Sequence, residues 1–157
     1  FRGSLVENIS LGDPRVSEQK ALWAAAQVGY LDHLKKTGRD LHFKIEERGA
    51  NLSVGERQLI AFARILAFDP QIFILDEATA NIDSQSESLI QAATEKLMKG
   101  RTSLIIAHRL STVQNCDQIL VLDQGRVAEI GTHQNLMAKK GLYAQMVESG
   151  FSTSETL

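Results

Sequence analysis

The stretch Gln-Ile-Phe-Ile-Leu-Asp-Glu at residues 71–77 decides the fold class of this 157-residue chain. Its β-branched and aromatic side chains, bounded by Pro70 and by two carboxylates, are typical of a strand buried on both faces of a sheet. The sequence predicts a helix over residues 84–98 and a second buried strand over residues 103–107. A strand, a helix and a strand in this order indicate a right-handed parallel crossover, so we expect an α/β fold.

The segments on either side of this unit also carry clear patterns. Four apolar residues with helical spacing predict a helix that stops at Asp69-Pro70, and they are Leu59, Phe62, Ala63 and Leu66. Ser17 is expected to cap an earlier helix. The other expected segments are a short helix at 31–34, a connector at 43–49, strands at 118–122 and 126–130, and a helical region at 132–148 with a gap at Gly141.

The composition is that of an ordinary globular chain, with 43% hydrophobic and 23% charged residues, which excludes collagen-like and wholly disordered proteins. A net charge of -2 gives no attraction for a polyanion, so no nucleic acid partner is expected. The single cysteine, Cys116, suits a reducing compartment. No apolar run approaches the about 20 residues of a membrane span. A chain that starts at Phe1 is expected to be a fragment.

Residues Ser53-Val54-Gly55-Glu56 fit a capping box at the start of the predicted helix that stops at Asp69, and simple capping would explain the Ser and the Glu. Capping does not explain Gly55, because glycine costs about 0.5 to 1 kcal/mol relative to alanine inside a helix. A close approach of a ligand to the backbone explains it better. Since a helix N-terminus favours negative charge, phosphate is the expected ligand.

Polar residues also follow the two buried strands. Asp76 and Glu77 end the first strand, where ligands of open α/β sheets usually bind, although a solvated strand end would look the same. Asp76 could hold Mg²⁺ through water while Glu77 polarises an attacking water. His108 ends the second strand, where a structural role and a phosphate-contacting role are both open.

Four motifs in order resemble the nucleotide-binding domain of ATP-binding cassette (ABC) transporters. Leu-Ser-Val-Gly-Glu-Arg-Gln at residues 52–58 resembles the family's signature motif, and residues 71–77 resemble its Walker B motif. Ala-Asn-Ile-Asp at residues 80–83 resembles the D-loop, and residues 105–112 resemble the loop of the switch histidine. Further segments are similar to those of exporters, at residues 3–9, 46–49 and 131–147.

The resemblance implies a role for each matching residue. Ser53 and Gly55, within the signature residues Leu52, Ser53, Val54, Gly55 and Glu56, would contact the γ-phosphate of an ATP held by a partner domain. Asp76 would bind Mg²⁺ through water, and Glu77 would orient or deprotonate the attacking water. His108 would contact the γ-phosphate, and Asp83 would organise the dimer interface. The family more often has Gly and Gln where this chain has Val54 and Glu56.

The resemblance also implies a division of the chain. Residues 1–68 would form the ABC helical subdomain, and residues 69–157 would form the C-terminal part of a P-loop NTPase (RecA-like) core with its C-terminal helices. The phosphate-binding loop Gly-x-x-x-x-Gly-Lys-Ser/Thr occurs nowhere in the chain. The isolated chain is therefore expected to be inactive, and the missing loop is expected to lie upstream in an intact parent.

The function implied is an ATPase portion of an ABC exporter at the cytoplasmic face of the inner membrane. Its expected cofactors are ATP and Mg²⁺, and its expected partners are a second nucleotide-binding domain, in a homodimer or heterodimer, and a transmembrane domain. Two alternatives stay open. One is an ABC-type ATPase of chromosome maintenance or DNA repair, and the other is a non-catalytic partner-binding module that kept the fold.

Overall fold

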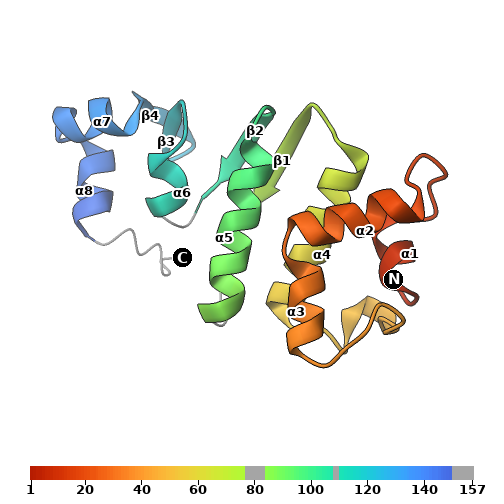
Figure 1. Cartoon of the computed structure of the whole chain (residues 1–157). Helices are drawn as coiled ribbons and strands as arrows, with labels where there is room; N and C mark the ends of the chain where they lie inside the picture. Colours follow the sequence, from red (N-terminus) through yellow and green to blue (C-terminus); the bar gives the residue numbers. More distant parts are fainter. Residues whose placement is uncertain (77–83, 108–109, 150–157) are drawn as a thin grey trace. The chain divides into compact units, whose positions relative to one another are not determined.

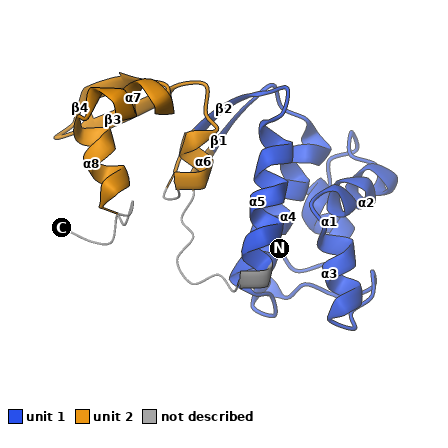
Figure 2. Cartoon of the chain, turned by 60° about the vertical axis from the view of Figure 1, so that its left-hand side comes forward, with its two compact units in different colours: residues 1–74, 80–104 blue, residues 75–79, 105–157 orange. Residues whose placement is uncertain are grey.

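The structure is a computed structural model that describes residues 1–76, 84–107 and 110–149 (Figure 1). It divides into two compact units (Figure 2). Unit 1 comprises residues 1–74 and 80–104, and unit 2 comprises residues 75–79 and 105–157. These units are defined by packing, whereas the expected boundary between residues 68 and 69 concerns the family's subdomains and stays a prediction.

Unit 1 is a group of helices that pack around one central helix. Its elements are α1 (Leu5–Ser10), α2 (Glu18–Gln27), α3 (Tyr30–Lys36), the 3₁₀ turn η1 (Glu47–Gly49), α4 (Val54–Phe68) and α5 (Ser84–Met98). The central helix is α4, which contacts α1, α2, α3 and α5. The four apolar residues that predicted it, Leu59, Phe62, Ala63 and Leu66, are all buried, so this expectation is confirmed.

Long side chains tie these helices to one another. Arg64 on α4 donates from Nε to the carbonyl of Asn8 on α1, at 2.6 Å. Lys96 on α5 donates from Nζ to the carbonyl of Gln27 at the end of α2, at 2.7 Å. Both bonds satisfy carbonyl groups close to helix ends, where no further turn of helix supplies a donor. The predicted cap of α2 is confirmed, because the Ser17 hydroxyl accepts from the backbone of Lys20.

Strands β1 (Ile72–Asp76) and β2 (Thr102–Ile106) pair in a two-stranded sheet and are connected through α5. The backbone N–H of Thr102 donates to the carbonyl of Gln71 at 3.0 Å. Gln71 directly precedes β1 and Thr102 begins β2, so the two strands start side by side and run in the same direction. The parallel strand pair expected from the sequence is thus confirmed.

The expectation that these strands are buried on both faces is wrong. Phe73 and Leu75 of β1 are buried, but Ile72 and Ile74 are each 68% exposed. Leu104 and Ile106 of β2 are 59% and 52% exposed. Side chains alternate between the faces of a strand, and in the described part of the chain only one face of this sheet is covered. The apolar residues of both strands correctly predict strands. They do not show what packs on them, and no described residue packs on the second face.

Unit 2 is a β-hairpin with three short helices. Its elements are α6 (Leu110–Gln114), β3 (Ile119–Asp123), β4 (Arg126–Gly131), α7 (His133–Lys139) and α8 (Leu142–Glu148). Gln124 and Gly125 connect the antiparallel strands, both with positive φ, as a two-residue turn of this kind requires. Buried side chains form its core, and they are Val113, Ile119, Val121, Leu136 and Tyr143. No helix of the described residues is long and apolar enough to cross a membrane.

Candidate phosphate-binding site

The structure brings one group of predicted site residues together at the N-terminus of α4. Leu52 precedes the helix, Ser53 is its N-cap, and Val54, Gly55 and Glu56 form its first turn. Asp76 lies at the end of β1. The other three predicted residues, Glu77, Asp83 and His108, lie outside the described residues, so their roles rest on the resemblance alone.

The predicted capping box is confirmed in the turn formed by residues 53–56, called here the signature turn. The Ser53 hydroxyl accepts from the backbone of Glu56 at 3.1 Å, and the Glu56 Oε2 accepts from the backbone of Ser53 at 2.8 Å. Ser53 and Val54 are exposed, whereas Gly55 is buried. The turn therefore presents a hydroxyl to solvent at the positive end of a helix of 15 residues.

The carboxylate of Glu56 points into the protein and not toward solvent. Its side chain is only 5% exposed, and its Oε1 accepts from the Arg39 guanidinium at 2.8 Å. The same oxygen lies 3.3 Å from Nε2 of His33 on α3. With Oε2 bonded to Ser53, both carboxylate oxygens have partners inside the protein. The Glu56 side chain therefore connects the signature turn to His33 on α3 and to Arg39, which follows α3.

Sequence reasoning missed Arg39 and His33. Arg39 is 17 residues and His33 is 23 residues before Glu56 in the chain, and neither belongs to a motif with fixed spacing. Tyr30 stacks on His33, with ring centroids 6.1 Å apart, and completes this cluster. Burial, together with the negative charge of Glu56, raises the pKa of the Tyr30 hydroxyl. No pattern in the sequence points to these partners, because the burial of the Glu56 side chain, which calls for them, is seen only in the structure.

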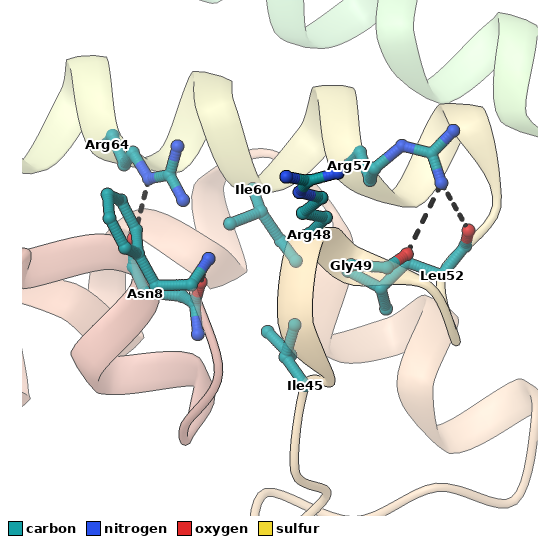
Figure 3. Close-up of a pocket in the computed structure, with 9 residues that line it drawn as sticks. Asn8, Ile45, Arg48, Gly49, Leu52, Arg57, Ile60 and Arg64 are labelled. Carbon is teal, nitrogen blue, oxygen red and sulfur yellow. Dashed lines mark hydrogen bonds between the residues drawn. The ribbon is translucent and has the colours of Figure 1, made fainter.

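A pocket with a volume of about 210 Å³ lies beside the residues that lead into the signature turn (Figure 3). Arg48, Arg57 and Arg64 line it, together with Phe1, Asn8, Ile45, Gly49, Leu52 and Ile60. Arg57 donates to the carbonyl of Leu52 at 2.7 Å and to that of Gly49 at 3.3 Å, which holds the chain just before the turn. Within the described residues, none of these three arginines forms an ion pair. The pocket is therefore positively charged.

Asp76 is the predicted Mg²⁺ ligand. It ends β1 and is exposed, so its carboxylate can take part in the oxygen coordination that Mg²⁺ prefers. Among the residues that the structure describes, no three His, Cys, Asp or Glu side chains gather to hold a metal ion. Since Mg²⁺ often binds through one or two carboxylates and several waters, a single carboxylate fits this kind of site.

Comparison with known proteins shows to which family this chain belongs. The sequence model of the family described as ABC transporter matches residues 3–80, which include α4, the signature turn and β1. A probable multidrug resistance ABC transporter ATP-binding/permease protein, YheH of Bacillus subtilis, is 52% identical over 148 residues, which cover 94% of this chain and 22% of that protein. The chain belongs to the ABC transporter family.

Other relatives agree with this family assignment. An ATP-dependent lipid A-core flippase of Xylella fastidiosa is 43% identical over 157 residues, which cover 99% of this chain and 27% of the flippase. The solved structure of a bacterial Atm1-family ABC exporter with ATP bound matches with a TM-score of 0.81 at 37% identity. That match covers 100% of this chain and 27% of the exporter chain. The chain thus spans roughly a quarter of the length of such relatives.

Proposed function

We propose that this chain is part of the ATP-binding domain of an ABC exporter and supplies that domain's signature turn, Walker B carboxylates and switch histidine. The observation that carries the proposal is the signature turn, whose Ser53 hydroxyl is exposed while its Glu56 carboxylate is buried and fully bonded. Such a turn can receive an anion, because its own negative charge faces inward. The names of the relatives favour a transporter over an ATPase of DNA repair.

In this proposal the signature turn acts on an ATP held by a second nucleotide-binding domain, of the same or of a different chain. The Ser53 hydroxyl donates to the γ-phosphate, and the dipole of α4 favours the phosphate charge. Gly55 has no side chain, so the phosphate can approach the backbone closely. Both domains together would then enclose the nucleotide, and a transmembrane domain would use the resulting closure for transport.

The carboxylates that follow β1 divide the work of hydrolysis in this proposal. Mg²⁺ supplies charge neutralisation for the phosphate oxygens when it is bound. The Asp76 carboxylate would hold the ion, and Glu77 would accept a proton from the attacking water. His108 donates to the γ-phosphate, and Asp83 helps to join the two domains. The host would be a transporter whose ATP-binding part lies on the cytoplasmic face of the membrane.

The chain contains no phosphate-binding loop, which would hold the β- and γ-phosphates with backbone amides and a lysine. We therefore propose that the isolated 157-residue chain does not hydrolyse ATP and needs that loop from elsewhere in the full-length transporter. Hydrolysis of Mg-ATP by the purified chain alone would contradict this part of the proposal.

Glu77→Gln in the full-length transporter tests the central step. Because an amide cannot accept the proton of the attacking water, the ATPase rate should fall by about 10²- to 10⁴-fold while ATP stays bound. Phosphate release and bound nucleotide are measured on the same preparation. The matched control is Glu95→Gln, which changes an exposed carboxylate on α5 and should keep the wild-type rate. A wild-type rate in Glu77→Gln would refute the proposed role of Glu77 as the base.

A further inference from the structure

The structure shows how the signature turn is fixed from inside the protein. The Glu56 side chain is 5% exposed, and it joins Ser53 to residues of another helix and loop. A buried carboxylate is stable only when hydrogen bonds and a positive charge replace the water that it loses. Within the described residues, these come from the Ser53 backbone, from Arg39 and from His33, and the last two residues do not belong to the signature motif.

Arg39 is the stronger of these two partners, since its guanidinium is charged at any physiological pH, whereas His33 carries a charge only when protonated. Its Nη1 lies 2.8 Å from Oε1 of Glu56, the distance of a charge-assisted hydrogen bond. Truncation of Arg39 would leave a buried carboxylate directly below the exposed hydroxyl of Ser53. That negative charge would repel a phosphate at the same turn.

The arginine is itself held in place from two sides. Gly38 follows the C-cap of α3 with a positive φ of 70°, and the backbone of Arg39 then donates to the carbonyl of Leu34 at 3.0 Å. The Arg39 guanidinium lies 4.5 Å from the centroid of the Phe43 ring, as in a cation–π contact. The backbone turn positions the Cα of Arg39, and the Phe43 ring packs against its guanidinium. Arg39 thus meets Glu56 in a fixed orientation.

We propose that Arg39, supported by Phe43, is a positioning residue that neutralises Glu56 and so prepares the signature turn for the phosphate of ATP. Arg39 does not touch the nucleotide in this proposal, because it acts through Glu56. The inference rests on the proposed function, in which the signature turn contacts the γ-phosphate. It adds the loop after α3 to the parts of the chain on which nucleotide hydrolysis depends.

The test is Arg39→Ala in the full-length transporter, measured alone and in a Glu56→Gln background. Arg39→Ala alone should lower the ATPase rate about tenfold, the change that corresponds to the loss of about 1.4 kcal/mol. In the Glu56→Gln background the same change should cost less than about threefold, because a neutral amide needs no cation. The affinity for ADP should stay at the wild-type value, since ADP has no γ-phosphate.

Lys35→Ala is the matched control, because Lys35 is an exposed cation on α3 that pairs with Asp32 and not with Glu56. It should keep the wild-type ATPase rate. A wild-type rate in Arg39→Ala would overturn the inference, and so would an equal loss in the Glu56→Gln background. A parallel loss of ADP affinity would also overturn it, because it would show general damage to the fold.

Gly55→Ala separates the inference from the function on which it rests. If Gly55→Ala abolishes hydrolysis and Arg39→Ala does not affect it, only the inference fails. If Gly55→Ala keeps the wild-type rate, the signature turn does not contact phosphate, and the proposed function of the turn fails together with the inference.

Discussion

Two turns of this chain have the same local structure and different surroundings. Ser4 to Glu7 opens α1 and Ser53 to Glu56 opens α4, each with a Ser hydroxyl that accepts from the Glu backbone and a Glu that accepts from the Ser backbone. The first carboxylate bond measures 2.7 Å and the second 2.8 Å. Glu7 is exposed, whereas Glu56 is buried against Arg39. The comparison shows that the capping bonds form without a buried cation, and that only the buried carboxylate of Glu56 is paired with one.

The two turns also differ at the position before the carboxylate. The turn of α1 has Val6 there, which is partly buried, and the turn of α4 has Gly55. A glycine inside the first turn lowers helix stability relative to most residues, and Val6 shows that this backbone geometry does not require it. The glycine and the buried cation occur at the same turn, which is why we interpret that turn as the functional one.

The largest expected effect comes from adding a methyl group at this position. In the full-length transporter, Gly55→Ala should lower the ATPase rate by about tenfold or more, because the side chain blocks the close approach of the phosphate. The melting temperature should not fall, since alanine has the higher helix propensity. Val6→Ala removes two methyl groups at the matching position of the other turn and should keep the wild-type rate. Unchanged hydrolysis in Gly55→Ala would make the two turns equivalent.

The next effect concerns stability and compares the two carboxylates. Glu56→Ala should lower the free energy of unfolding of the chain by about 2 kcal/mol, because it leaves Arg39 and the Ser53 backbone without their partner. Glu7→Ala should cost clearly less, since Glu7 is exposed and water replaces its bonds. Urea unfolding of both variants measures the difference. Equal losses would show that the buried contacts of Glu56 add nothing to the cap.

The smallest effect is a change in titration at the exposed turn. The hydrogen bond from the Ser4 backbone lowers the pKa of Glu7 the most, and the hydrogen bond from the Ser4 hydroxyl lowers it further. A lowered folded-state pKa contributes stability above the unfolded pKa, and this stability is lost as the pH falls through the folded pKa. Ser4→Ala should therefore move the Glu7 pKa upward, which NMR titration of the side-chain carbon detects. An unchanged pKa would mean that the hydroxyl contributes nothing to it.

The sequence predicted those parts of the fold that depend on local patterns. Helix α5 begins and ends at the expected residues, Ser84 and Met98, and the capping box at Ser53 is present. The prediction that Ile72 and Ile74 are buried was wrong, because an apolar side chain in the sequence does not reveal which residues pack against it. The bond between Arg39 and Glu56 could not be predicted from the sequence for a similar reason. It depends on how α3 packs against α4, and no spacing in the chain encodes that contact.

The bond between Arg64 and the carbonyl of Asn8 has a consequence for the order of folding. It joins residues 56 positions apart, so Asn8 leaves the ribosome well before its partner is made. Helix α1 has six residues, far fewer than the about 12 to 15 that a helix needs for marginal stability alone in water. Although α1 precedes α4 in the chain, it should thus become stable later than α4. Pulse-labelling hydrogen exchange should accordingly show protection of the α1 amides only after those of α4.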